Sequence, residues 1–237
     1  MIPLLHLTIF ISAIFCLFAA RRLYSSFRRT RNINIGNFFK VFLTLTLYFS
    51  FVSLPGILAD PTWIQISYIF SYIFLFFSPI WFLKAAFNMF RFPWGKYIII
   101  IVLVMIIVTI FLNIFFSFPA QIQTFNHKFY HWSEGTPSWL GIFNGILIGI
   151  LALGSSFLFF FGGLRSKEKL IRLRALLIGG GLDLLVVSAL LAYTTAALLK
   201  GVMRWSAGMA ASLLTLPGLI LILVGIYYRG QEKEGSA

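Results

Sequence analysis

The sequence has almost no cysteine and little acidic charge. Cys16 is its single cysteine, so the chain can form no internal disulfide, and a cluster of cysteine and histidine ligands would lack sulfur. Six acidic residues face nineteen basic ones, which gives a formal net charge of +13. Only 11% of the 237 residues are charged, whereas 60% are hydrophobic, a composition that excludes a water-soluble fold.

Motifs of several enzyme and cofactor classes are also missing. The sequence contains no Walker loop, no glycine-rich dinucleotide turn and no nucleophile elbow. Serine, histidine and acidic residues follow no recognisable triad order, and the last apolar segment has no lysine for a retinal Schiff base. We therefore expect a protein that is not an enzyme and that carries no cofactor.

Long apolar runs fill most of the chain. A helix needs about 20 residues to cross about 30 Å of hydrocarbon, and seven segments reach that length. The sequence therefore predicts an all-α polytopic membrane protein, a seven-helix bundle forming one transmembrane domain over residues 1–237. The approximate helices are 2–20, 38–58, 63–87, 97–118, 139–163, 171–199 and 206–228.

Basic residues are concentrated in alternate links between these segments. All of the basic residues except Lys128, Lys200 and Arg204 fall on one side of the predicted bundle. The positive-inside rule then places the N-terminus outside and the tail 229–237 in the cytoplasm, most simply in a bacterial plasma (inner) membrane. This rule accounts for the positive charge without nucleic acid, and the same residues are expected to contact anionic lipid headgroups.

The longest external link, 119–138, has a regular apolar pattern. Ile122, Phe125, Phe129 and Trp132 recur at spacings of three, four and three, which would gather them on one face of a helix. This spacing predicts a short amphipathic helix lying on the outer membrane surface.

Three histidines are predicted on that outer side. His127 and His131 would lie one turn apart on the external helix, and His6 begins the first segment. Imidazoles four residues apart on a helix can share a zinc ion, which makes the three weak metal candidates. Because acidic and sulfur ligands are scarce nearby, interfacial contacts with lipid headgroups explain these histidines better, and no metal site is predicted.

Asp183 is the only carboxylate inside a predicted membrane span. A charge at this depth is costly, so Asp183 should face the protein interior or water. It either contacts a proton, ion or ligand, or it is held by a hydroxyl or backbone group of a neighbouring helix, and the sequence leaves both open. The candidate polar partners in a cleft are Tyr68, Tyr72 and Asn113.

Small residues and prolines indicate how the helices pack. Four-residue spacing of small residues permits close helix approach within the bundle or, alternatively, in a homodimer. Two prolines fall inside predicted helices and should kink them. The packing candidates are Gly141, Gly145, Gly149, Ser188, Ala192 and Ala196, and the expected kinks are at Pro79 and Pro217.

The basic fifth link and the helix after it carry a family resemblance. The link begins Gly163-Leu164-Arg165-Ser166-Lys167 and continues through Arg172-Leu173-Arg174 into a leucine-rich helix that reaches Gly179. With seven helices and an external N-terminus, the chain resembles the seven-helix sensory modules of bacterial histidine kinases and related receptors. The resemblance implies sensing through a separate partner protein, because no kinase or cyclase domain follows the last segment.

Three functions follow from these observations. The first is a stand-alone sensor, receptor-like protein or accessory subunit that signals through another membrane or cytoplasmic protein. The second is a small transporter or channel that uses Asp183 near the membrane midplane. The third is a membrane scaffold or assembly factor that packs against other chains through its small-residue ridges.

Overall fold

The computed structural model describes residues 4–58, 60–119, 122–125, 129–132, 136–195, 198 and 201–228. The described chain is helical apart from one short hairpin. The elements are α1 (Leu4–Thr30), α2 (Ile33–Ser53), the 3-10 turn η1 (Leu54–Gly56), α3 (Pro61–Phe90), α4 (Gly95–Phe115), β1 (Ile122–Phe125), β2 (Phe129–Trp132), α5 (Ser138–Arg165), α6 (Lys169–Ala189), the π-helical segment η2 (Leu190–Thr195) and α8 (Gly201–Tyr227).

Seven of these helical stretches are long and apolar enough to cross a membrane. The sixth stretch continues from α6 into η2 and ends at Tyr193, and the seventh covers Trp205–Tyr227. The chain therefore has the helices of an integral, multi-pass membrane protein, as the hydropathy pattern predicts.

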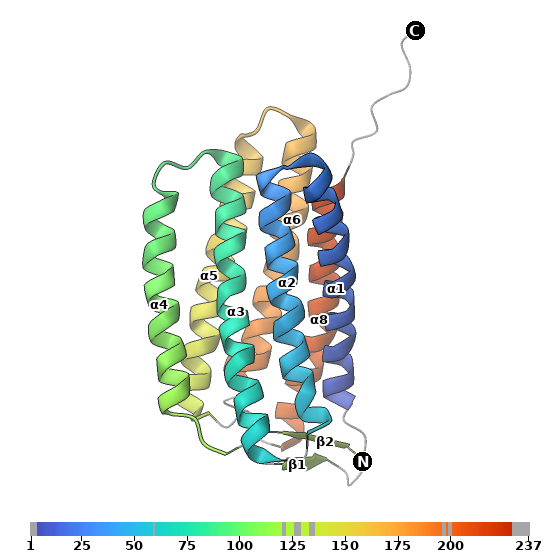
Figure 1. Cartoon of the computed structure of the whole chain (residues 1–237), viewed down its shortest axis with the longest axis vertical. Helices are drawn as coiled ribbons and strands as arrows, with labels where there is room; N and C mark the ends of the chain where they lie inside the picture. Colours follow the sequence, from blue (N-terminus) through green and yellow to red (C-terminus); the bar gives the residue numbers. More distant parts are fainter. Residues whose placement is uncertain are drawn as a thin grey trace.

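The helices run side by side in one bundle, and the links between them alternate between its two ends (Figure 1). One end, named the basic end, carries residues 21–40, 84–96 and 165–174, which include most of the described lysines and arginines. The opposite end, named the hairpin end, carries β1 and β2 and the first residues of α1, α3, α5 and α8 (Figure 1).

Side-chain caps determine where two of the helices begin. The Asn32 side chain accepts hydrogen bonds from two backbone amides in the first turn of α2. Asp60 does the same for α3, and Pro61 occupies the first helical position, where no amide donor is needed. Both caps use amides that would otherwise lack a partner in the first turn of a helix.

The external link corrects one prediction from the sequence. In place of an amphipathic helix within 119–138, Ile122–Phe125 and Phe129–Trp132 form two antiparallel strands. Ile122 lies opposite Trp132, and Phe125 lies opposite Phe129. The register pairs the four apolar positions two by two across the strands, but the two pairs are three residues apart, so they do not share the single face that the helical spacing predicts.

Aromatic side chains join the helices near the basic end. The Phe38 ring of α2 lies 6.3 Å from Phe82 of α3 and 6.2 Å from Phe159 of α5, measured between ring centroids. The three side chains belong to one buried cluster that continues into α1, α6 and α8. Edge and tilted ring contacts of this kind favour one packing arrangement of the helices.

Helix α4 stands at the edge of the bundle (Figure 1). Its buried residues beyond the first turn are Val102, Ile106, Thr109 and Asn113, spaced four, three and four apart along one face. It is the most apolar of the seven spans and the one with the smallest buried share. Most of its surface therefore faces outward, where the bilayer would lie.

Candidate functional site: a cavity at the hairpin end

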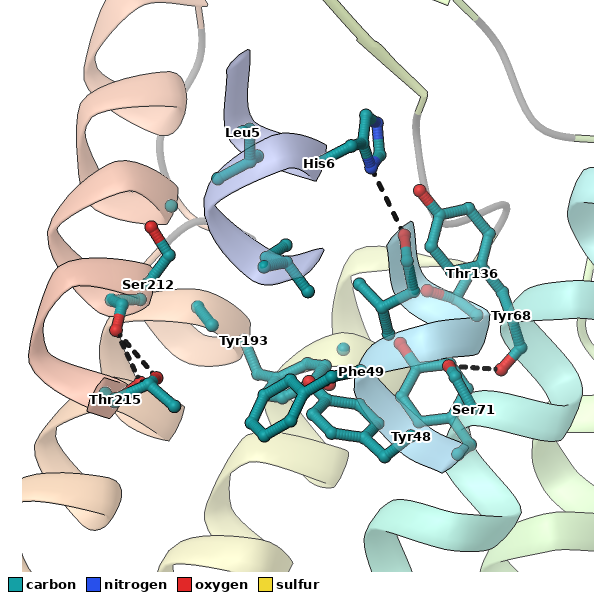
Figure 2. Close-up of a pocket in the computed structure, with 18 of the residues that line it drawn as sticks. Leu5, His6, Tyr48, Phe49, Tyr68, Ser71, Thr136, Tyr193, Ser212 and Thr215 are labelled. Atoms are coloured by element: carbon teal, nitrogen blue, oxygen red, sulfur yellow. Dashed lines mark hydrogen bonds between the residues drawn. The ribbon is translucent and has the colours of Figure 1, made fainter. Parts of the chain in front are cut away.

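A cavity of about 150 Å³ lies between the helices at the hairpin end. It is lined by residues of α1, α2, α3, α5, α6, η2 and α8, so segments from both halves of the sequence form its wall (Figure 2). Its lining residues are mostly aromatic, small or hydroxylated: Leu5, His6, Ile9, Tyr48, Phe49, Val52, Tyr68, Ser71, Tyr72, Thr136, Pro137, Ser138, Gly141, Ser188, Ala192, Tyr193, Trp205, Gly208, Ala211, Ser212 and Thr215.

A proline just after α2, in η1, changes the hydrogen bonding at the end of α2 next to this cavity. Pro55 has no backbone N–H, so it cannot donate to the Phe51 carbonyl one turn earlier. The Ser67 hydroxyl of α3 donates to that carbonyl instead, at 2.5 Å. The adjacent Val52 carbonyl accepts from the ring of His6 on α1, at 3.2 Å. Side chains of two other helices are thus anchored at the end of α2.

His6 is the most distinctive polar residue in the cavity wall. It is only 4% exposed, and its Nδ1 faces the Val52 carbonyl oxygen (Figure 2). A carbonyl oxygen can only accept, so Nδ1 is the donor, and Nε2 of a neutral imidazole is then an acceptor. Within the described part of the chain Nε2 has no hydrogen-bond partner. A buried acceptor without a partner is costly, but Nε2 has almost no accessible surface and so does not open onto the cavity.

The π-helical segment η2 forms the inner wall. Its Tyr193 hydroxyl lies 2.7 Å from the Tyr48 hydroxyl of α2. The Tyr193 ring also contacts Tyr72 of α3, with ring centroids 5.9 Å apart. π-helical turns are rare and often lie at functional sites, because the wider turn redirects side chains. Here the wide turn coincides with the cavity-lining residues Ala192 and Tyr193.

A second cavity of about 80 Å³ lies next to the first. The two share Tyr48 and Tyr193, together with Phe49, Ser188, Ala192 and Thr215. The second is lined mainly by apolar residues of α2, α3, α5 and α6 and includes Pro79. The hydrogen-bonded tyrosine pair therefore lies at the boundary between the larger cavity, which has the more polar wall, and the smaller, mainly apolar one.

Hydroxyl groups hold the α8 wall in place. Ser212 of α8 lies 3.0 Å from Thr8 of α1, measured between the hydroxyl oxygens. Ser188 of α6 lies 2.7 Å from Thr215 and donates to the Ala211 carbonyl at 2.8 Å. Hydrogen bonds between helices such as these contribute specific, modest stabilisation inside a membrane.

Asp183 lies outside this cavity. Its carboxylate accepts a 2.6 Å hydrogen bond from Ser156 of α5, whose hydroxyl also lies 3.1 Å from the Gly179 carbonyl. Asp183 precedes Tyr193 by ten residues, which corresponds to about 15 Å along a helix. Of the two arrangements left open by the sequence, the described contacts are those of a carboxylate held by a neighbouring helix.

The other polar candidates are divided between two places. Tyr68 and Tyr72 are buried in the cavity wall, at 5% and 2% exposure. Asn113 is instead paired with Asn144 of α5 through two reciprocal amide hydrogen bonds of 2.8 Å and 3.0 Å. The structure therefore brings together Tyr68, Tyr72 and His6, and it leaves Asn113 and Asp183 elsewhere.

Two of the three histidines expected on the outer side lie on different elements, His6 on α1 and His131 on β2. His131 belongs to β2, where it pairs with Gln123, so its four-residue spacing from His127 has no helical meaning. His127 itself lies outside the described residues. Among the residues that the structure describes, no three histidine, cysteine or acidic side chains form a group suited to a metal ion.

Among the described glycines, the closest approach of two helix backbones involves α6 and α8. A Cβ added at Gly181 would lie 2.6 Å from the Gly218 carbonyl oxygen, so the two backbones touch at this crossing. A Cβ added at Gly149 would make an ordinary contact, 3.6 Å from Leu190. Gly141 and Ala192 line the cavity, Gly145 is buried on α5, and Ala196 lies outside the described residues.

Both prolines predicted to kink helices lie within continuous ones. Pro79 is buried in α3, where the Ser78 hydroxyl donates to the Leu75 carbonyl that Pro79 cannot serve. Pro217 is exposed on α8, next to the close crossing at Gly218. Neither proline interrupts the assigned helix.

Comparison with known proteins gives no further guide to the site. No protein-family model matches the chain, and no curated protein matches it in sequence.

Proposed function

We propose that this chain is a membrane sensor or receptor-like subunit that binds a small ligand in the cavity at the hairpin end. The cavity of about 150 Å³, whose wall of aromatic and hydroxylated side chains comes from both halves of the sequence, carries this proposal. The His6 ring also lines this cavity and is held by the Val52 carbonyl of α2. The resemblance to seven-helix sensory modules supports the same role.

The orientation proposed for the chain places the cavity on the outer side. Arginines and lysines gather at the basic end, and the positive-inside rule assigns such an end to the cytoplasm of a bacterial plasma membrane. Several of these cations also rest on aromatic rings, as Arg22 does on Tyr227 at 4.5 Å and Lys40 on Trp81 at 4.4 Å. These side chains would meet anionic lipid headgroups.

A continuous set of contacts connects the cavity to the basic end. Tyr193 lies in the cavity wall, and the same helix carries Asp183, which is bonded to Ser156 of α5. Closer to the basic end, Arg174 donates to the Tyr228 carbonyl at the end of α8, at 2.7 Å. Movement of η2 on ligand binding would thus reach both α5 and α8, where a partner protein would detect it.

A transporter is the second candidate, and the adjoining cavities favour it. A pathway through the bundle would pass the Tyr48–Tyr193 hydrogen bond and enter the smaller cavity. Asp183, the residue expected to serve transport, is not among the described residues that line either cavity. The small-residue ridges, expected for a scaffold, have contacts within the bundle at Gly149 and Ser188.

The sensor proposal is tested by filling the cavity with a larger side chain and measuring the distance between two spin labels at the basic end. Ala192→Leu places a larger side chain between the two cavities, and Ala210→Leu makes the same change on the exposed face of α8. Spin labels at Lys96→Cys and Lys167→Cys, both exposed at the basic end, report the separation of two links. Cys16 is replaced by alanine in all variants.

We expect Ala192→Leu to shift the distance distribution between the labels and Ala210→Leu to leave it unchanged. Filling the cavity imitates occupancy and biases any two-state element attached to it. Identical distributions in both folded variants would contradict coupling between the cavity and the basic end. A substrate flux in proteoliposomes that Ala192→Leu abolishes would favour the transporter instead.

A further inference from the structure

Two lysines lie inside the apolar spans of α2 and α3, close to the basic end. Lys40 is seven residues past the first residue of α2, and Lys84 is six residues before the last residue of α3. At 1.5 Å per residue, both backbones are about 10 Å from the end of their helix. A charge at this depth in a membrane is costly unless its side chain reaches the interface or meets an opposite charge.

The ammonium groups of these two lysines lie on the same indole ring. Nζ of Lys40 is 4.4 Å from the centroid of the Trp81 ring, and Nζ of Lys84 is 4.7 Å from it. A cation gains energy over the face of a tryptophan, but two cations at one ring repel each other. In each of the other described cation–ring contacts, a ring meets a single cation. Trp81 is thus the described ring at which two positive charges converge.

No described carboxylate forms an ion pair with either lysine. Asp60 caps α3 at the hairpin end, and Asp183 accepts a hydrogen bond from Ser156. Glu168, the other described acidic residue, is exposed in the link between α5 and α6. An anion from outside the chain would offset the repulsion between the two ammonium groups and could accept hydrogen bonds from both.

An aromatic face of α3 leads up to the lysine pair. Its outward side chains recur at alternating spacings of four and three residues, which places them on one face of the helix. None of them is fully buried; they are Phe70, Phe74, Phe77, Trp81 and Lys84. Helix α2, which carries the second lysine, lies beside α3 (Figure 1). Positive charge at one end and aromatic rings along the rest match a phospholipid, with its anionic headgroup and its acyl chains.

We propose that Lys40 and Lys84, together with Trp81, bind the headgroup phosphate of one anionic phospholipid, whose acyl chains lie along the aromatic face of α3. This site is separate from the cavity at the hairpin end, so it does not depend on the ligand-binding function proposed above. It differs from the general attraction of basic links to anionic lipid, because it holds a single molecule at a defined place. A free phosphate compound has the charge but lacks the chains, so the ligand is the lipid.

Native mass spectrometry of the whole chain, purified in detergent and titrated with lipid, tests this site. The probes are phosphatidylglycerol, phosphatidylcholine with the same acyl chains, and the soluble headgroup obtained by deacylating phosphatidylglycerol. We expect the first phosphatidylglycerol to bind about 30-fold more tightly than the first phosphatidylcholine, the factor expected from two lysines near a membrane surface. Equal binding of the two lipids would overturn the proposal. Displacement of phosphatidylglycerol by an equimolar amount of the soluble headgroup would also overturn it, because the chains would then contribute nothing.

Two pairs of substitutions that remove the same charge test the position of the site. Lys40→Gln with Lys84→Gln should weaken the first phosphatidylglycerol binding about 30-fold. Lys96→Gln with Lys167→Gln is the control and should leave that binding unchanged. Lys96 lies on the Tyr97 ring as a single cation, and Lys167 is exposed in the link between α5 and α6. Equal losses in the two pairs would show that net charge alone attracts the lipid, which would contradict a site at Trp81.

Discussion

Replacing either of the two buried asparagines between α4 and α5 should lower the free energy of unfolding. Replacing both should lower it by less than the sum of the two single effects. Asn113 and Asn144 are 1% and 0% exposed, and their amides exchange two hydrogen bonds. Asn113→Leu or Asn144→Leu keeps a branched side chain of similar shape. Either change leaves the opposite amide buried without the partner on the neighbouring helix.

The two hydrogen bonds between Asn113 and Asn144 determine the size of the expected free-energy effect. Hydrogen bonds between membrane helices average about 0.6 kcal/mol each and reach about 1.7 kcal/mol, so the pair is worth about 1–3 kcal/mol. An unsatisfied buried amide costs a similar amount. We expect each single substitution to cost about 2 kcal/mol, and the double substitution to cost about 1–3 kcal/mol less than the sum of the two.

Reversible unfolding in bicelles, followed by steric trapping, measures the four free energies of the double-mutant cycle. Asn113→Leu combined with Ser155→Ala is the control, because the buried Ser155 hydroxyl bonds only within its own helix. The control pair should be additive within about 0.5 kcal/mol. Additivity of the asparagine pair to the same degree would refute the argument that their mutual bonds hold α4 to α5.

Two further stability predictions use matched neighbours in the sequence. Ser156→Ala should lower the free energy of unfolding by about 1–2 kcal/mol because it removes the donor to Asp183. Ser155→Ala, the control, should lower it by less than about 1 kcal/mol. Equal losses for the two variants in an unfolding titration would count against the Ser156–Asp183 bond. Gly181→Ala should lower the free energy of unfolding by about 1–3 kcal/mol, because the added methyl group forces apart the backbone contact with Gly218. Gly180→Ala, with open space around it, should leave that free energy unchanged or raise it. Equal effects of the two substitutions in the same titration would disprove the close crossing.

The hydropathy of the sequence is sufficient to predict the seven spans. Runs of about 20 apolar residues have few alternatives to membrane helices, and the structure has seven helices of that kind. Their ends are less predictable, because helices continue beyond the apolar residues. Helix α1 extends through Arg21 and Arg22 to Thr30, where charged side chains still favour helical backbone outside an apolar environment.

The hairpin shows why periodicity alone can mislead. Apolar residues at 122, 125, 129 and 132 fit one helical face, but they also fit a register symmetric about a turn. Asn126, directly after β1, was the available signal, because asparagine is common in turns and poor in helix interiors. A segment of this length does not by itself distinguish the two arrangements.

The cavity depends on contacts that no local pattern encodes. Tyr68 and Tyr72 share a predicted polar face of α3, and the structure places both in the wall. The importance of His6 follows from its contact with Val52, forty-six residues away in the sequence. The wide turn of η2 likewise has no sequence signal. Long-range packing, rather than composition, brings these groups together.

The exposed position of α4 has a consequence for the order of assembly during synthesis. Its sequence is the most apolar of the seven spans, so it can enter the bilayer and remain there without help from neighbouring helices. Because α5 follows α4 in the chain, Asn113 of α4 has no Asn144 to bond until α5 has been made and inserted. Because α4 packs mainly against α3, which precedes it, we expect α4 to join α3 first and the asparagine pair to fix the rotation of α4 once α5 is in place.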